Sequence, residues 1–402
     1  MTTHSSDQVL PVVVQKYGGS SVADIDRLKQ VAQRVVGTAR AGHRVVVVVS
    51  AMGQTTDELI ALARAASAAP SRREMDMLVS AGERIASALL AMSIESLGVP
   101  AISFTGSQCG IITSHRHTDA RILEVRPYRV FDELDEGRVV VIAGYQGVSY
   151  KREVTTLGRG GSDTTAVAMA AALGAIHCEI CSDVDGVYDG DPRVVSAASH
   201  LEQLSYDEMT ELAQHGAKVL NAEAVAMARR AGIAIYARAS SGDGNVTRIS
   251  AEGSGRAVVG VSGLRDLSLL RAEGGAATLR ALVEVLRESE VTPLSARLDA
   301  HRDGARPTLL LVRDRCHDYA KLLDALRAAA GGELDVREGL EAATVVGEGL
   351  TEDPAGLAQA LAVAEGESLP MIGLYAGARR LTLLLEGGKL DEAVRALHRA
   401  FV

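Results

Sequence analysis

The sequence contains no tryptophan and only three phenylalanines among its 402 residues. Proteins that bind single-stranded nucleic acids stack the bases on aromatic side chains, so this chain has little from which such a surface could be built. Its formal net charge of -9 at pH 7 also argues against broad binding to nucleic acids or anionic membranes. We therefore expect no nucleic-acid partner, whereas a locally basic pocket for an anionic substrate is compatible with this composition.

Long apolar runs are also missing. No stretch approaches the roughly 18 consecutive apolar residues that a membrane-spanning helix needs. The first residues, MTTHSSDQ, lack the basic and then apolar layout of a secretory signal peptide. We therefore expect no membrane partner and a cytoplasmic location.

The four cysteines are too few and too scattered for a disulfide framework in a chain of this length. Two of them, Cys178 and Cys181, form a C-x-x-C pair, which is a spacing found in redox and zinc sites. No second pair at zinc-ligand spacing accompanies them, and both lie in a mainly apolar run, residues 176–181, that is typical of a buried strand. Packing is the favoured interpretation, with redox or metal chemistry as the alternative.

Short apolar segments alternate with helix-forming segments over the first 240 residues. The expected strands are residues 12–14, 44–49, 139–142, 176–181 and 233–236, and the clearest expected helices are residues 25–39, 75–97 and 164–173. Fully apolar strands separated by helices indicate a mostly parallel sheet that is covered on both faces. We therefore predict an α/β domain over residues 1–240, a three-layer αβα sandwich with ligands at the carboxyl ends of its strands.

The composition changes after residue 240. Residues 241–256 are polar and rich in glycine and serine, and we interpret them as a linker. Two small α+β modules are expected beyond it, at residues 257–335 and 336–402. Their expected strands are residues 267–270, 309–312, 342–346, 372–375 and 381–385, and their expected helices are residues 276–289, 355–364 and 390–401.

Residues 16–21 (KYGGSS) follow the first expected strand directly. Their two glycines would let the backbone approach a ligand and present N–H groups to an anion, with Lys16 beside them. The alternative is a plain Gly-Gly turn.

Residues 155–165 (TTLGRGGSDTT) lead into an alanine-rich helix. Ser162 or Asp163 could cap that helix, so that its positive dipole end would face the loop. Arg159 offers a planar fork that suits a carboxylate or a phosphate. A capped helix after an ordinary loop would explain the serine and the aspartate but not an arginine within a glycine run, so the functional interpretation is favoured.

Residues 182–193 (SDVDGVYDGDPR) follow a buried strand and are rich in acidic and turn residues. Such a loop could hold nucleotide hydroxyls or a magnesium ion, and a solvated turn is the alternative. The P-loop signature and the H-R-D and D-F-G elements of protein kinases are absent. Any phosphoryl transfer must therefore use a different phosphate cradle.

In order along the chain, these three motifs resemble those of the aspartate kinases of the amino-acid kinase family. The resemblance covers residues 12 to about 240 and includes four further stretches: 50–59 (SAMGQTTDEL), 80–84 (SAGER), 103–108 (SFTGSQ) and 216–220 (GAKVL). It implies the amino-acid kinase fold, followed by two ferredoxin-like ACT modules. It also implies ATP-dependent phosphorylation of the β-carboxylate of aspartate, the first step of the aspartate pathway.

The resemblance also implies roles for individual residues. The catalytic residues would be Lys16, Arg159, Asp163 and Lys218. The nucleotide would contact Lys16, Gly18, Gly19, Ser20, Ser182, Asp183, Tyr188, Asp191, Arg193, Lys218 and Val219. Aspartate would contact Ser50, Thr55, Glu83, Arg159, Gly160, Gly161 and Ser162, with Arg159 at its α-carboxylate and Glu83 at its ammonium group. Magnesium would be held mainly by the phosphates of ATP, and we expect no metal site built from protein side chains.

The chain departs from the family pattern mainly in its C-terminal part, where relatives usually bind lysine or threonine as feedback inhibitors. Residues 271–277 (RAEGGAA) stand where an Asp-x-Pro-Gly turn is typical, and residues 291–297 (VTPLSAR) replace a segment rich in Asn, Ile and Asp. We expect the modules to form a homodimer while feedback inhibition is weakened or lost; the alternative is that they still bind a small molecule. Nearer the nucleotide, Cys181 and residues 189–191 (DGD) are milder departures.

Two other functions remain open at this point. The chain could phosphorylate another small substrate, such as glutamate, a carbamate or a nucleotide, although Thr55, Glu83 and Arg159 together argue against this. It could also be a catalytically inactive sensor that uses the ACT-like modules. Retention of the four catalytic positions argues against that function.

Overall fold

The structure is a computed structural model of the chain, and it describes residues 10–242, 244–301, 304–316, 318–352 and 354–402. The chain divides into two compact units. The first comprises the chain up to Tyr188, His200–Ala213 and Lys218–Gly255, and the second comprises Asp189–Ser199, Gln214–Ala217 and Arg256–Val402. The second unit therefore includes two short segments that lie, in the sequence, between parts of the first.

An eight-stranded sheet forms the centre of the first unit, with the strand order β12-β14-β13-β9-β1-β2-β6-β3. The strands are β1 (Val12–Tyr17), β2 (Arg44–Val49), β3 (Ala101–Phe104), β6 (Val139–Ala143), β9 (His177–Ser182), β12 (Gln203–Ser205), β13 (Ile235–Ala239) and β14 (Val246–Ser250). All neighbouring pairs are parallel except β13 and β14. The predicted mostly parallel sheet is confirmed.

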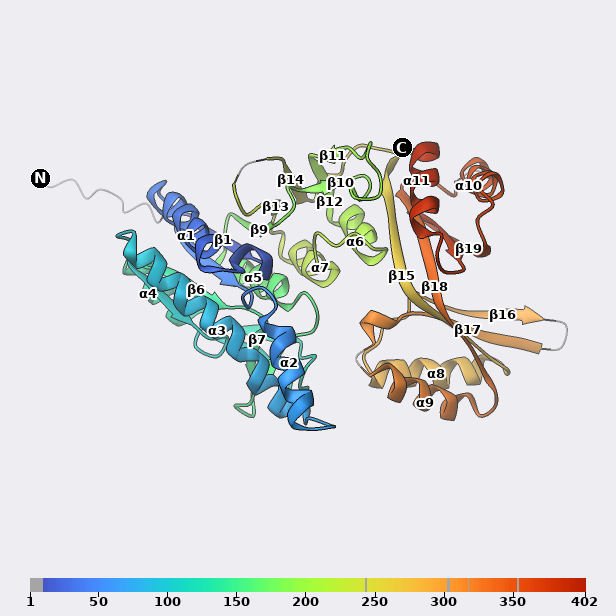
Figure 1. Cartoon of the computed structure of the whole chain (residues 1–402), viewed down its shortest axis with the longest axis horizontal. Helices are drawn as coiled ribbons and strands as arrows, with labels where there is room; N and C mark the ends of the chain where they lie inside the picture. The colour runs from blue at the N-terminus through green and yellow to red at the C-terminus, as the bar shows by residue number, and fades with distance from the viewer. Residues whose placement is uncertain (1–9, 243, 302–303, 317, 353) are drawn as a thin grey trace, which may run out of the picture. The chain divides into compact units, whose positions relative to one another are not determined.

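Helices cover both faces of this sheet. They include α1 (Ile25–Arg40), α3 (Arg72–Ser96), α5 (Gly161–Leu173) and α7 (Ala222–Ala231) (Figure 1). The apolar side chains of α1 and α3 pack with Tyr17 of β1 and with alternate valines of β2 and β6. Lys16 contacts α5 through Asp163, and it must point to the opposite face from Tyr17 because side chains alternate along a strand. Three layers result.

By length and composition alone, α3 could cross a membrane. One such helix is weak evidence, because the core helix of a soluble domain passes the same test. Half of its apolar window is buried within the fold, against α1 and the sheet. This environment is that of a core helix.

Several elements, most of them short, were not predicted. A small sheet with the order β5-β4-β7-β8 contains β4 (Ile111–Thr113), β5 (Ile122–Val125), β7 (Gln146–Ser149) and β8 (Val154–Thr156). The other elements of this unit are α2 (Thr55–Ala66), α4 (Tyr128–Asp135), α6 (Tyr206–Gln214), the 3-10 helix η1 (Gly19–Val22) and a hairpin of β10 (Val187–Tyr188) and β11 (His200–Leu201). Strands of two to four residues carry too few side chains for a periodic pattern.

The expected linker also contains structure. Its residues 246–250 form β14, which pairs with both β12 and β13. Three residues of the strand are buried, Thr247, Ile249 and Ser250, and Ile249 alone among them is apolar. This pattern is too short to stand out among the surrounding glycines and serines.

The second unit is a six-stranded antiparallel sheet with the order β16-β17-β15-β18-β20-β19. Its elements are β15 (Val258–Ala272), α8 (Ala276–Glu288), β16 (Ser295–His301), β17 (Gly304–Val312), η2 (Arg313–Arg315), α9 (Tyr319–Ala330), β18 (Leu334–Gly347), α10 (Pro354–Gly366), β19 (Met371–Gly377), β20 (Arg380–Leu385) and α11 (Leu390–Phe401). In Figure 1, α8 and α9 lie together near one end of the long strands β15 and β18, and α10 and α11 lie near the other end.

Each helix pair has its own apolar core, which is consistent with two ACT-like modules. The two modules share strands, because β15 and β18 run through both. Val261, early in β15, packs with the α10–α11 core, whereas Leu270, late in β15, packs with the α8–α9 core. The structure therefore differs from two modules that simply follow each other along the sequence.

Candidate active site

Lys16 and Asp163 form a buried ion pair at the carboxyl end of β1. Lys16 Nζ lies 2.7 Å from Asp163 Oδ1, and each side chain is only 11% exposed. Lys16 is the penultimate residue of β1, and Asp163 lies in the first turn of α5. The pair therefore holds an ammonium group where the positive end of the α5 dipole and the glycine loop meet.

The loop after β1 lies against the loop after β2. The N–H of Gly53 donates to the carbonyl of Gly19 at 3.1 Å. A Cβ atom at Gly19 would lie 2.8 Å from the carbonyl oxygen of Ala51, so only glycine fits there. Contact with a neighbouring loop is thus one reason for this glycine.

Two side chains predicted to bind aspartate share a hydrogen bond, and a third accepts one from the backbone beside them. Ser50 Oγ lies 2.8 Å from Ser162 Oγ, and Ala51, next to Ser50, donates its N–H to Glu83 Oε1 at 3.2 Å. Ser50 follows β2, Glu83 lies on α3, and Ser162 lies on α5. Residues from three distant parts of the sequence therefore meet at this end of the sheet.

Glu83 is the most unusual carboxyl group of this set. The residue is 3% exposed, and within the described part of the chain its Oε2 atom has no hydrogen-bond partner. Burial raises the pKa of Glu83 to about 7, although the N–H of Ala51 opposes this effect. A buried acceptor without a partner normally costs free energy, so the site is suited to a ligand that donates hydrogen bonds.

The glycine-rich loop before α5 is held by a residue that sequence reasoning missed. Asn221 donates from Nδ2 to the carbonyl of Arg159 at 2.9 Å, and its Oδ1 accepts from the N–H groups of Glu223 and Ala224 at the start of α7. Gly160 has a φ of 73°, and a Cβ atom there would lie 2.3 Å from Asn221 Nδ2. An asparagine before a helical run is a typical N-cap, and this pattern in the sequence could have identified Asn221. The side chain of Arg159 is exposed.

The predicted cap of α5 was wrong. Gly160 is the N-cap residue, and no side chain caps the helix. Ser162 and Asp163 lie within the first turn instead, where their side chains contact Ser50 and Lys16. The left-handed backbone at Gly160 makes the turn into the helix, which leaves both side chains available for the site.

Asp76 is a second residue that the sequence did not single out. It is fully buried, and its carboxylate accepts from Thr156 Oγ1 at 2.5 Å and from the N–H of Thr118 at 2.9 Å, with His117 Nδ1 2.7 Å away. Burial raises the pKa of Asp76, and the bonds from Thr156 and His117 oppose this effect. Asp76 thereby ties the end of β8, just before the glycine-rich loop, to the helix that carries Glu83.

The predicted nucleotide residues are distributed over both units. In the first unit, Ser182 ends β9, Asp183 and Lys218 are exposed, and Val219 follows Lys218 in the loop before α7. The Tyr188 hydroxyl donates to Asp185 Oδ1 at 2.8 Å. In the second unit, the Arg193 guanidinium pairs with Asp191, donating from Nε at 3.0 Å and from Nη2 at 2.8 Å.

The described residues contain no group of three or more His, Cys, Asp or Glu side chains that could hold a metal ion. Cys178 and Cys181 are buried free thiols. Burial raises the pKa of Cys181 to about 12, so this group stays protonated at neutral pH.

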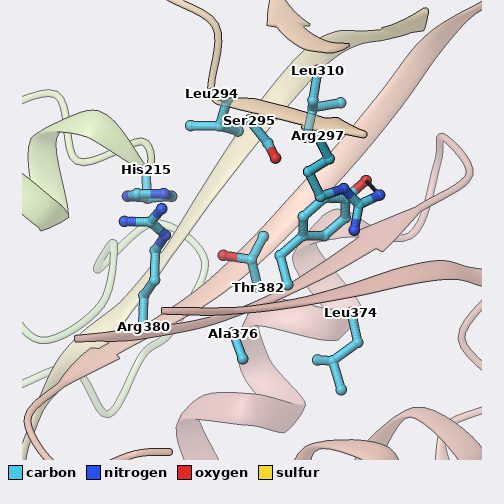
Figure 2. Close-up of a pocket in the computed structure, with 10 residues that line it drawn as sticks. His215, Leu294, Ser295, Arg297, Leu310, Leu374, Ala376, Arg380 and Thr382 are labelled. Carbon is cyan, nitrogen blue, oxygen red and sulfur yellow. Dashed lines mark hydrogen bonds between the residues drawn. The ribbon is translucent and has the colours of Figure 1, made fainter. Parts of the chain in front are cut away.

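A separate pocket of about 180 Å³ lies in the second unit (Figure 2). It is lined by His215, Leu294, Ser295, Arg297, Leu310, Leu374, Tyr375, Ala376, Arg380 and Thr382. Three of these residues, His215, Arg297 and Arg380, are basic and none is acidic. The Arg297 guanidinium lies 4.4 Å from the centre of the Tyr375 ring, and Figure 2 shows the Arg380 guanidinium against the His215 imidazole.

Comparison with known proteins gives a consistent result. Residues 11–237 match the amino acid kinase family. The aspartokinase of Mycolicibacterium smegmatis is 44% identical over 412 residues, which cover 98% of this chain and 96% of that protein. The aspartokinase of Thermus thermophilus is 40% identical, with coverage of 98% and 99%.

A solved structure of E. coli aspartokinase III in complex with aspartate and ADP matches with a TM-score of 0.85 and 25% identity, covering 97% of this chain and 99% of that one. A structure of the same enzyme with lysine and aspartate matches with a TM-score of 0.73 and 26% identity, at the same coverage. The chain therefore belongs to the amino acid kinase family and, within it, to the aspartokinases.

Proposed function

We propose that this chain transfers the γ-phosphoryl group of ATP to the side-chain carboxylate of aspartate, giving 4-phospho-L-aspartate and ADP. The observation that carries this proposal is the arrangement at the carboxyl end of the parallel sheet. A buried ammonium group, Lys16, is held by Asp163 at 2.7 Å, and Ser162, the neighbour of Asp163, contacts Ser50 beside the Glu83 carboxyl group. Lys16 thus suits a phosphate, whereas Ser50, Ser162 and Glu83 suit an amino acid.

The aspartate substrate carries an ammonium group that needs an acceptor. Glu83 Oε2 is buried and, among the described residues, has no hydrogen-bond partner. Ionisation of Glu83 is unfavourable in the empty site, and a substrate ammonium would restore it by pairing with the carboxylate. Arg159 supplies the planar fork that matches the substrate α-carboxylate, and its loop is fixed through Asn221.

The chemistry requires no general base. The side-chain carboxylate of aspartate has a pKa near 4 and is already ionised at neutral pH. One of its oxygens attacks the γ-phosphorus, the bond from that phosphorus to the bridging oxygen breaks, and the bonding electrons leave with ADP. The difficulty is electrostatic, because an anion must approach another anion.

Cationic groups would lower this barrier. Lys16 would hold the transferring phosphoryl group, Lys218 would reach the other phosphates, and the α5 dipole would add positive potential. Asp163 would keep the Lys16 ammonium in place. Magnesium, bound when ATP is bound, would neutralise phosphate charge.

A panel of substrates tests the proposal. The full chain is incubated with ATP, magnesium and hydroxylamine, with aspartate or glutamate as the acceptor, and both ADP and the hydroxamate are measured. Hydroxamate from aspartate alone is the expected result. Formation from glutamate alone would show a kinase of another carboxylate, and ATP-independent binding of a small molecule without any turnover would show a sensor.

We further infer that the chain is cytoplasmic, that the first unit is its catalytic domain, and that the ACT-like modules of the second unit mediate homodimerisation. Feedback inhibition would be weakened. The pocket of the second unit supports this, because Leu294, Ser295 and Arg297 come from the segment that departs from the family pattern. A lysine side chain in that pocket would meet the positive charges of Arg297 and Arg380, which is unfavourable.

A further inference from the structure

The segment Asp189–Ser199 connects the two strands of a hairpin in the first unit but belongs to the second unit. Tyr188 at the end of β10 pairs with His200 at the start of β11, and the eleven residues between them are part of the second unit. Val195 is 5% exposed and lies in the apolar core that α10 and α11 share with the sheet. A segment that carries predicted nucleotide residues is thus anchored in the C-terminal unit.

Asp189 is the main anchor of this segment. It is 1% exposed, its N–H donates to the carbonyl of Ser199 at 3.0 Å, and its carbonyl accepts from the N–H of Val261 at 2.7 Å. Its Oδ1 accepts from the N–H of Ser199 at 2.8 Å, and its Oδ2 lies 3.2 Å from Arg256 Nη1. The first residue of the segment is therefore fixed through both its backbone and its side chain.

His398 completes this set of contacts. It lies in the last turn of α11, is 6% exposed, and places Nε2 2.9 Å from Asp189 Oδ1. The His398 ring also leaves little room for a side chain at Gly190, the residue after Asp189, because a Cβ atom there would lie 3.1 Å from His398 Cδ2. A buried carboxylate depends strongly on its hydrogen bonds, so removal of His398 would weaken the hold on Asp189.

The predicted nucleotide residues lie on both sides of this anchor in the sequence. Tyr188 precedes Asp189 directly. Asp191 follows two residues later, and its carbonyl accepts from the N–H groups of Val194 and Val195 at 2.8 Å, which forms a tight turn. Arg193 lies in that turn and pairs with Asp191. The backbone position of Asp189 therefore determines where the segment that presents Asp191 and Arg193 begins.

We propose that His398 is a positioning residue for nucleotide binding. Through its hydrogen bond to Asp189, the last helix of the chain fixes the segment that presents Asp191 and Arg193 to ATP. The inference rests on the proposed function, and it takes the nucleotide roles of Asp191 and Arg193 from the resemblance to the aspartate kinases. It adds that affinity for the nucleotide depends on a contact made within the C-terminal unit.

The test is calorimetric titration of the full chain with ADP, combined with steady-state kinetics. His398→Leu is expected to weaken ADP binding about tenfold, because a buried carboxylate loses a hydrogen bond. The KM for ATP should rise by the same factor, whereas kcat and the KM for aspartate should change less than about twofold. His398→Gln keeps an N–H donor at a similar reach and should recover most of the affinity.

Arg399→Leu is the matched control. Arg399 lies in the same turn of α11, but its partner is Glu367, 2.8 Å away, and both side chains are exposed. The control should bind ADP as the unchanged chain does. Equal loss of affinity in both leucine variants, or unchanged affinity in His398→Leu, would overturn the proposal.

Asp189→Asn tests the contact from its other side. This substitution keeps the volume of the side chain. It replaces His398→Leu as the test variant if His398→Leu lowers the folded fraction too far for titration. It should also weaken ADP binding, and the double variant with His398→Leu should be no weaker than either single variant, since both remove the same contact. Full additivity would contradict the proposal. ADP titration needs no acceptor, so failure to phosphorylate aspartate would disprove the proposed function without changing this result.

Discussion

Glu83 shows how much of the proposed recognition rests on one side chain. Its carboxyl group is held by the N–H of Ala51 on one oxygen only, and burial raises its pKa to about 7. Near neutral pH the empty site therefore holds a mixture of carboxylic acid and carboxylate. Only the carboxylate can pair with an ammonium group, so proton release and substrate binding should be linked.

This linkage predicts a pH dependence of aspartate binding. Below a pKa of about 7, the site must lose a proton before it can accept the substrate ammonium. The KM for aspartate should thus fall as the pH rises from about 6 to about 8, approaching tenfold per pH unit at the acid end. Glu83→Gln should raise the KM and remove most of this dependence.

Glu58→Gln provides the control, because Glu58 is an exposed residue of α2. It should leave the pH profile unchanged. A profile in the unchanged chain that is flat across this range would show that Glu83 does not bind the ammonium group.

Residues near the site differed in how far the sequence could identify them. Lys16 and Asp163 stand in motifs where a charged side chain among glycines and serines is conspicuous, and the structure pairs them. Asn221 and Asp76 contact the site loop across 62 and 80 positions of sequence. Contacts of that kind depend on the packing of distant elements, and no local pattern marks them.

At the scale of elements, β9 carries a buried charge cluster near the site. Glu179 accepts from Gln15 Nε2 at 2.8 Å and from Arg238 Nη1 at 3.1 Å, and Arg34 Nη2 lies 3.4 Å away. Burial alone would raise the pKa of Glu179, but His177, Arg34, Arg238 and Gln15 outweigh it and lower the pKa to about 2. These contacts join α1 and β13 to β9, the strand that ends at Ser182.

The cluster predicts a stability that depends on pH. The folded-state pKa lies below the ordinary value of 4.5, so the stabilisation is complete above that value and is lost as the pH falls towards about 2. Glu179→Gln should lower the free energy of unfolding by up to about 3 kcal/mol at neutral pH, and by much less near about pH 3. Urea unfolding at both pH values measures this.

Glu202→Gln is the comparison, since Glu202 is exposed. It should change the free energy of unfolding by less than about 0.5 kcal/mol at either pH. A Glu179→Gln chain that is as stable as this control at neutral pH would contradict the assigned role.

The elements themselves were predictable in proportion to their length. The strands β1, β2, β6 and β9 and the helices α1, α3 and α5 have enough apolar residues at regular spacing to be found from the sequence. β14 and the four strands of the small sheet have three to five residues each. Their pairing depends on partners that become adjacent only in the folded chain.

At the scale of the whole molecule, the sequence predicts a catalytic part followed by two α+β modules. It does not predict that two short segments from within the catalytic part of the sequence belong to the C-terminal unit. Asp189–Ser199 and Gln214–Ala217 belong to the second unit. Gly216 explains part of this, because a Cβ atom there would lie 2.0 Å from the carbonyl oxygen of Gly263. Nothing in the composition of these segments separates them from their neighbours in the sequence.

Altered regulation is the prediction at this scale. Lysine should inhibit weakly or not at all at low millimolar concentration, because its side-chain ammonium would face Arg297 and Arg380 in the pocket of the second unit. Initial rates are measured with lysine and threonine, singly and together, with norleucine as an uncharged analogue of lysine. Strong inhibition by lysine in this range would contradict weakened feedback.

The central claim is that Lys16 acts on the transferring phosphoryl group, and the turnover of Lys16→Ala tests it most directly. Formation of aspartyl hydroxamate is compared with that of the unchanged chain and of Lys29→Ala, which removes an exposed lysine of α1. Circular dichroism verifies that all three are folded. We expect kcat to fall by a factor of roughly 10² to 10³ in Lys16→Ala and to be unchanged in Lys29→Ala. Near-normal turnover in a folded Lys16→Ala chain would contradict the account.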